Sequence, residues 1–209
     1  MSIISDPQQI EKKSFEIIEG LLAGKGLASP DKDVIVRVVH ATADPDFADA
    51  MRFSPGAAEA GIAALRAGCA VITDVKMLKS GISMVNSGTP SEVFCFISDD
   101  DTADSAKEAG TTRAAASMRK AHEMGLLNGA IVAIGNAPTA LFELIRLVQE
   151  EGARPALVIG VPVGFVGAAE SKEELAKVTE VPFITCLGKK GGSPVGASAL
   201  NALIKLAKS

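Results

Sequence analysis

The chain has 209 residues, of which 47% are hydrophobic and 22% are charged, and its formal net charge is -4. This is the composition of an ordinary globular protein, long enough to bury a core without disulfides or metals. A slightly acidic chain without Trp or Tyr offers neither the cationic surface nor the stacking rings of a typical nucleic-acid binder. It also lacks an apolar signal core and any apolar run of roughly 20 residues, so we expect a cytoplasmic protein that does not cross a membrane.

Helices and strands are predicted to alternate along the chain. Asp6-Pro7 is typical of a helix start, and apolar residues at helical spacing extend this first helix to Leu22. Strands are predicted over residues 34–39, 70–73, 93–97, 130–134, 156–161 and 182–187. Further helices are predicted over residues 55–65, 111–124, 138–150 and 197–207, and the capping box Ser171–Glu174 is predicted to open another.

Six apolar strands separated by helices predict an α/β fold with a mostly parallel sheet covered by helices on both faces. No linker and no repeat divides the chain, so we expect a single doubly wound domain over residues 1–209. Residues 98–110 contain four aspartates and are predicted to form a solvated loop.

Several common sites can be excluded by their spacing. Cys69, Cys95 and Cys186 are far apart without a C-x-x-C pair, so we interpret them as small buried apolar residues in a reducing compartment and expect no metal cluster. The segment 20–26 is one residue short of a phosphate-binding P-loop and lacks the hydroxyl residue after its lysine. No dinucleotide fingerprint and no nucleophile elbow is present.

In open α/β sheets, ligands bind outside the carboxyl ends of the strands. This rule selects five segments in which Gly, His, Lys and Asn concentrate. They are His40–Thr42, Asp74–Lys76, Gly135–Pro138, Gly160–Gly164 and Gly188–Ser193.

The two histidines differ in their surroundings. His122 lies beside Lys120 and Glu123 in a predicted helix and is interpreted as a surface residue. His40 follows the run Val34–Val39, where it is either a core histidine or a group that gives and takes a proton near neutral pH, as imidazole does.

Three cations are candidates for binding an anionic ligand. Arg113 begins a predicted helix, where it either faces solvent or joins the exposed N–H groups in holding a carboxylate. Lys189 and Lys190 lie among glycines in a segment that is either an anion site or a flexible turn. Asp44 and Asp46 are predicted to cap the next helix.

Taken together, these segments resemble the precorrin-8X methylmutase family over about residues 14–202. The strings that carry the resemblance are Arg37-Val-Val-His40-Ala-Thr-Ala-Asp44, Arg52-Phe-Ser-Pro-Gly-Ala, Ala60–Gly68, Asp74-Val-Lys-Met, Thr112-Arg113-Ala-Ala-Ala-Ser-Met-Arg, Gly135-Asn-Ala-Pro-Thr-Ala-Leu-Phe142, Gly160–Ser171 and Gly188-Lys-Lys-Gly-Gly-Ser193.

The resemblance implies an isomerase of cobalamin biosynthesis. Such an enzyme moves a methyl group from carbon 11 to carbon 12 of precorrin-8X, or of its cobalt form, to give hydrogenobyrinic or cobyrinic acid. It implies His40 as proton donor or acceptor, a tetrapyrrole substrate, a homodimer with the active site near the interface, and no metal or other cofactor. Together with the position of the cations, it suggests that Ser14, Arg113, Asn136, Lys189 and Lys190 bind the substrate.

Two other functions are compatible with the same residues. One is an α/β module that binds a nucleotide or a small phosphorylated ligand, against which the failed phosphate motifs count. The other is a non-catalytic carrier that holds the corrinoid product, against which the intact His40 counts.

Overall fold

The computed structural model describes residues 5–83 and 90–208. In these residues, six strands form one sheet in the order β1-β6-β5-β4-β2-β3. The strands are β1 (Met51–Phe53), β2 (Val71–Thr73), β3 (Val93–Phe94), β4 (Ile131–Ile134), β5 (Leu157–Gly160) and β6 (Phe183–Cys186). β1 pairs antiparallel with β6, and all other pairs are parallel. The predicted α/β fold with a mostly parallel sheet is confirmed.

Ten helices accompany the sheet in the described ranges. They are α1 (Pro7–Leu21), α2 (Asp31–Thr42), α3 (Phe47–Ala50), α4 (Ala57–Arg66), α5 (Lys76–Gly81), α6 (Asp100–Glu108), α7 (Arg113–Glu123), α8 (Pro138–Glu150), α9 (Ala168–Leu175) and α10 (Ser193–Ala207). None of them is long and apolar enough to cross a bilayer.

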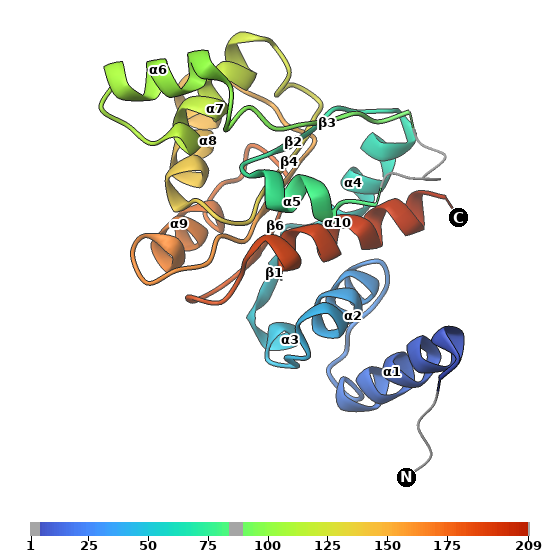
Figure 1. Ribbon diagram of the computed structural model, residues 1–209. Coiled ribbons are helices and arrows are strands. Elements are labelled where there is room, and N and C mark those ends of the chain that lie inside the picture. Colours follow the sequence, from blue (N-terminus) through green and yellow to red (C-terminus); the bar gives the residue numbers. More distant parts are fainter. Residues whose placement is uncertain (1–4, 84–89, 209) are drawn as a thin grey trace.

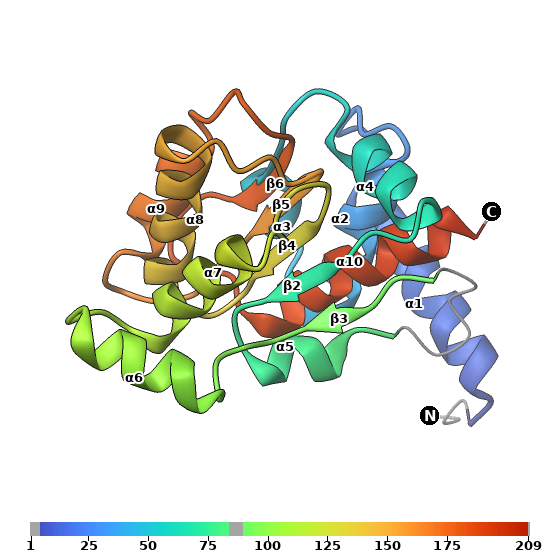
Figure 2. The same ribbon diagram turned by 90° about the horizontal axis from the view of Figure 1, so that it is seen from above.

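The two faces of the sheet carry two separate cores. Because successive strand residues point to opposite faces, Ile131 and Ala133 join one cluster while Val132 and Ile134 join the other. Helices α4, α5 and α10 cover the first face, and α6 to α9 lie on the second (Figure 2). On the first face, α2 packs outside α10 and α1 packs outside α2 (Figure 1).

The predicted strand over residues 34–39 is wrong, because these residues form the middle of α2. Val34, Ile35, Val38 and Val39 are buried, a spacing that places them on one helical face against α10 and α1. Packing on two helices therefore outweighs the strand propensity of the β-branched side chains. The sixth strand is instead β1, which was not predicted.

Two further predictions of local structure are wrong. Residues 98–110 do not form a loop, because α6 occupies most of the segment with Asp100 and Asp101 in its first turn, where acidic groups favour a helix. The capping box at Ser171 does not open α9, which begins three residues earlier after Gly167. The Ser171 hydroxyl donates to the Ala168 carbonyl inside the helix.

Candidate active site

His40 lies in the last turn of α2, so it does not follow a strand as predicted. A cationic group is favourable at this end of a helix, where the carbonyl groups carry partial negative charge. Its imidazole stacks on the ring of Phe15 from α1, with the ring centroids 4.9 Å apart and an interplanar angle of 28°. Val38 and Val39 are buried beside it, so packing of α1 and α2 fixes where the ring lies.

Two hollows share His40 in their walls. The first, called the apolar hollow, has a volume of about 290 Å³ and is lined by Ser14, Ile17, Ile18, Leu21, Val39, His40, Ala43 and Pro45. It lies between α1 and the end of α2. The predicted substrate contact Ser14 thus borders the same hollow as His40.

The second hollow, called the cationic hollow, has a volume of about 410 Å³ and lies between α2 and α10. Its lining includes His40, Arg37, Ser198, Asn201, Lys205 and Lys208. None of the described residues that line it is acidic. Sequence reasoning did not single out Lys205 and Lys208, because they lie about 165 residues from His40 and no motif joins them.

Arg37 is held in place from α1. Its guanidinium lies 5.1 Å from the centroid of the Phe15 ring, and Nη1 donates to Glu11 Oε1 over 3.1 Å. The side chain lies one turn before His40 on the same face of α2, since the two are three residues apart. A cation is therefore fixed next to the imidazole.

The other predicted site residues lie at the carboxyl ends of the strands, in separate groups. Arg113 begins α7 and is exposed. The neighbouring Thr112 accepts from the Ala115 N–H as N-cap, and its hydroxyl lies 2.7 Å from that of Thr139 in α8. Arg113 and the exposed Asn136, which precedes α8, are thus brought to the same part of the edge.

Asp74, at the end of β2, occupies three N–H groups that lie just before α8. Its carboxylate accepts from the N–H groups of Gly135, Asn136 and Ala137 over 2.8–3.1 Å. The carboxyl is fully buried, and burial raises its pKa despite these bonds. Asp74 therefore satisfies three N–H groups just before α8, and the exposed Asn136 can offer its side chain to a ligand.

The two lysines after β6 point to different partners. Lys189 Nζ lies 5.4 Å from the centroid of the Phe165 ring, which is 86% exposed. Lys190 Nζ lies 2.6 Å from Asp44 and 2.9 Å from Asp46, in the turn that follows α2. Its hydrogen bond to Asp44 lowers the pKa of that carboxyl. Asp44 and Asp46 were predicted to cap a helix, and Asp46 is the N-cap residue of α3, although its side chain makes no capping hydrogen bond.

The structure also shows where His122 and the three cysteines lie. His122 is half-buried and not a plain surface residue, and its Nε2 lies 3.2 Å from Glu151. All three cysteines are free, and Cys186 is buried while Cys69 and Cys95 are half-buried.

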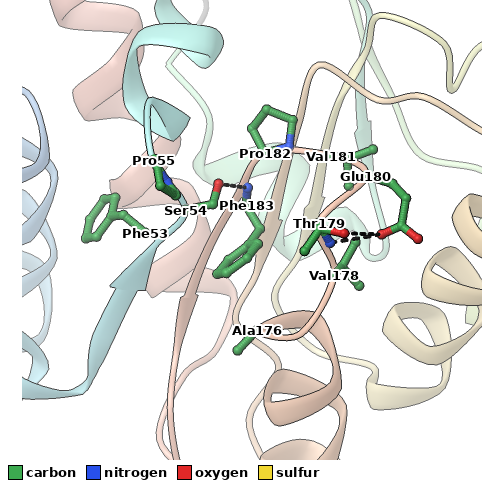
Figure 3. Close-up of a pocket in the computed structure, with 10 residues that line it drawn as sticks. All are labelled: Phe53, Ser54, Pro55, Ala176, Val178, Thr179, Glu180, Val181, Pro182 and Phe183. Carbon is green, nitrogen blue, oxygen red and sulfur yellow. Dashed lines mark hydrogen bonds between the residues drawn. The ribbon is translucent and has the colours of Figure 1, made fainter.

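Another cavity of about 410 Å³ lies at the opposite edge of the sheet, between the end of β1 and the start of β6 (Figure 3). The Ser54 hydroxyl accepts from the Phe183 N–H there, over 2.9 Å. The lining includes Glu180, which accepts from the Thr179 N–H, and this hydrogen bond lowers the pKa of the carboxyl. No histidine is among the described residues that line this cavity, whereas His40 lines both hollows.

The chain is similar to known proteins over nearly its whole length. A family model described as precorrin-8X methylmutase matches residues 9–206. The cobalt-precorrin-8 methylmutase of Priestia megaterium is 50% identical over 204 residues, which cover 97% of this chain and 89% of the relative. The precorrin-8X methylmutase of Pseudomonas aeruginosa is 42% identical over 201 residues, covering 96% of both chains.

A solved structure shares the fold. The precorrin-8X methylmutase from Thermus thermophilus superposes with a TM-score of 0.89 at 41% identity and covers 96% of each chain. Neither a nucleotide-binding module nor a non-catalytic carrier is needed to explain such full-length similarity. The chain therefore belongs to the precorrin-8X methylmutase family and is a methylmutase, an isomerase of cobalamin biosynthesis that moves a methyl group within one molecule.

Proposed function

We propose that this enzyme moves the methyl group on carbon 11 of precorrin-8X, or of cobalt-precorrin-8, to carbon 12, and that His40 transfers the proton that assists the shift. The products are hydrogenobyrinic acid and cobyrinic acid, respectively. The observation that carries the proposal is the place of His40, in the wall that an apolar hollow shares with a cationic one.

The chemistry needs little more than a proton and a fixed geometry. One carbon–carbon bond breaks at carbon 11 and one forms at carbon 12 while the conjugated double bonds rearrange. Substrate and product are isomers, so a proton that His40 gives to the macrocycle must return before the product leaves. Protonation lowers the electron density that opposes migration, and general acid catalysis typically contributes 10²–10⁴-fold. Positioning of the ring supplies much of the rest. The proposal includes no redox cofactor and no catalytic metal, because the reaction is an isomerisation.

The two hollows match the two parts of a corrin precursor. The ring is flat and apolar, and the side chains of Ile17, Leu21 and Val39 can cover one of its faces beside the imidazole. The rim carries carboxylates, which Arg37, Lys205 and Lys208 can meet in the cationic hollow. An overall charge of -4 does not oppose this, because a local cluster of cations decides the capture of an anion.

The predicted substrate contacts complete the proposal. Ser14 donates a hydrogen bond from the wall of the apolar hollow. Arg113, Lys189 and the side chain of Asn136 hold carboxylates along the edge of the sheet. Lys190 has three N–H donors and gives two of them to Asp44 and Asp46, so one remains for the substrate.

We also propose that the enzyme is a homodimer with its active site near the interface. A hollow of about 290 Å³ is at the lower limit of ligand pockets, which typically measure 300–1,000 Å³, so it holds only part of a tetrapyrrole. Ile17 and Leu21 in its wall are 54% and 56% exposed. A second subunit against α1 would cover these side chains and the outer side of the substrate.

The proposal is tested by following the absorption spectrum of precorrin-8X and of cobalt-precorrin-8 with the parent protein, His40→Ala and His122→Ala. His122→Ala is a matched control because it removes the other histidine, which lies in α7 and pairs with Glu151 at the end of α8. We expect conversion by the parent and the control, and binding without conversion by His40→Ala.

The outcomes separate the substrate from the mechanism. A parent protein that binds neither compound would show that the substrate is wrong. Normal turnover by His40→Ala would leave the substrate in place and exclude the proton-transfer role of His40.

A further inference from the structure

Lys172 in α9 is a fully buried lysine that pairs with no carboxylate among the described residues. Its exposed fraction is 0%, and no ion pair joins it to a carboxylate in the described part of the chain. Burying such a group is unfavourable unless hydrogen bonds compensate for the lost contact with water. A leucine or methionine at this position of α9 would avoid the unfavourable burial of a polar group. The hydrogen bonds that Lys172 makes are therefore the feature that distinguishes it from an apolar residue.

Both partners of Lys172 lie in and after β6. Its Nζ donates to the Lys190 carbonyl over 2.5 Å and lies 3.8 Å from Cys186 Sγ. The Cys186 thiol donates to the same carbonyl over 3.3 Å. Burial lowers the pKa of Lys172 and raises that of Cys186, as expected for groups held away from water. Two buried donors thus converge on one backbone oxygen.

The carbonyl of Lys190 belongs to the glycine-rich segment Gly188–Gly192, which has high conformational freedom. Gly188, Gly191 and Gly192 all have positive φ, at 81°, 153° and 122°. Glycine has more conformational freedom to lose than other residues, so a loop with three of them needs contacts from outside to stay in one shape.

The contacts of the Gly188–Gly192 segment come from the β5–α9 connection and from α9. Gly192 N donates to Val161 O over 2.9 Å, and Lys189 O accepts from Gly164 N over 3.2 Å. The Lys190 carbonyl, between these two points, is held by the side chain of Lys172. On either side of it, Lys189 reaches Phe165 and Lys190 reaches Asp44 and Asp46.

We propose that Lys172 is a positioning residue, which fixes the Gly188–Gly192 loop and thereby the directions of the Lys189 and Lys190 side chains at the active site. It does not touch the substrate, because its ammonium is buried beneath the loop. Through its ion pairs with Asp44 and Asp46, Lys190 also connects the loop to the turn after His40. The part of the inference that concerns turnover rests on the proposed function, whereas the part that concerns the loop does not.

The chain contains no Trp and no Tyr, so Phe165→Trp introduces a single fluorescent reporter next to Lys189. A lysine also lies well on a Trp ring, so the contact is kept. In this background, Lys172→Met removes the buried donor at similar size, and Lys189→Met shows the signal of a lost contact. Lys177→Met is the matched control, because Lys177 lies exposed just beyond α9 and pairs with Glu174.

We expect Lys172→Met to lower the fluorescence anisotropy of the reporter and to increase its quenching by acrylamide, toward the values of Lys189→Met. The melting temperature should stay unchanged or rise, because an apolar group replaces a buried charge. A residue with a merely structural role would instead lower the melting temperature without moving the reporter. For turnover we expect about a tenfold loss in kcat/KM, mainly through KM.

A second variant disturbs the loop with Lys172 intact. A Cβ at Gly191 would collide with the Val161 carbonyl oxygen and lie 2.8 Å from that of Pro162. Gly191→Ala should therefore move the reporter in the same direction. If Lys172→Met does not fold, Lys172→Gln keeps an N–H donor of shorter reach, and its signal should lie between those of the parent and Gly191→Ala.

Each outcome decides the inference. A reporter that stays at the control value in folded Lys172→Met or Lys172→Gln, while Gly191→Ala moves it, overturns the role of Lys172. A moved reporter with unchanged turnover supports the role of Lys172 and shows instead that the loop does not bind the substrate.

Discussion

The ring of His40 is oriented by one aromatic neighbour, Phe15, whose own ring also lies against Arg37. The imidazole of His40 and the guanidinium of Arg37 therefore both pack against the Phe15 ring from α1. Such an arrangement supports the imidazole and the guanidinium through their flat faces, while Arg37 Nη1 donates to Glu11.

We expect Arg37→Gln to raise KM for the tetrapyrrole about tenfold with a smaller effect on kcat, because a charge-assisted hydrogen bond to a carboxylate contributes about 1.5–3 kcal/mol. Steady-state kinetics measure this. Glu11→Gln is the control, since it removes the ion pair of Arg37 and leaves the guanidinium. An equal rise in KM for both variants would mean that the ion pair, and not substrate binding, explains the effect.

Asp74 stabilises the fold by accepting hydrogen bonds from three N–H groups near the start of α8. We expect Asp74→Ala to lower the free energy of unfolding by about 2 kcal/mol, because three N–H groups at the start of α8 lose their acceptor. Asp74→Asn keeps one acceptor oxygen and should lose less. Urea unfolding followed by circular dichroism measures both, and a loss below 0.5 kcal/mol in Asp74→Ala would contradict the assignment.

At the scale of helices, one carboxylate joins α7 to α8. Glu143 accepts from Arg119 at 2.8 Å and 3.1 Å and from Arg146 at 2.7 Å and 3.1 Å. Burial opposes ionisation of Glu143, but the hydrogen bonds from the two arginines outweigh it, so its pKa lies below the ordinary 4.5. The folded state therefore binds a proton at Glu143 less readily than the unfolded state.

Because the pKa of Glu143 is lower in the folded state, its ionised form stabilises the protein. The contribution of Glu143 to stability is complete above pH 4.5 and is lost as the pH falls through the lower, folded-state pKa. Urea unfolding between pH 7 and pH 3 should show a shallower loss on acidification for Glu143→Gln than for the parent, and lower stability at pH 7. Glu174→Gln, from an exposed pair, should follow the parent curve. Parallel curves for the parent and Glu143→Gln would exclude the role.

At the scale of the whole molecule, α1 forms an outer layer that rests on α2 (Figure 1). Its outward side chains Ile10, Ile17 and Leu21 are exposed. Apolar side chains gathered on an outer helix are typical of an interface. Their position beside the apolar hollow connects the proposed homodimer to the active site.

We expect the double variant Ile17→Lys, Leu21→Lys to shift the protein from dimer to monomer in analytical ultracentrifugation, because two charges would be buried in the interface. Met124→Lys is the control, since Met124 is equally exposed at the end of α7. A double variant that sediments like the parent dimer would place the interface elsewhere, and a monomeric parent would exclude the homodimer.

The sequence determined the features that depend on local pattern. The buried strands β2, β4, β5 and β6 were predicted within one or two residues of their bounds, because continuous apolar runs between helices have one simple interpretation. The long strings around His40, Gly135 and Gly160 are enough to indicate the family, since they are read along the chain and do not depend on its folding.

Only the tertiary structure decided what depends on distant partners. Residues 34–39 are helical because α1 and α10 bury their apolar face, and a six-residue apolar run fits a helix or a strand equally well. For the same reason the sequence placed His40 at the end of a strand, whereas it lies one layer outside α10. Lys205, Lys208 and Lys172 gained their surroundings from residues far away in the chain. Burial and charge pairing arise from packing between elements, which no local pattern in this sequence records.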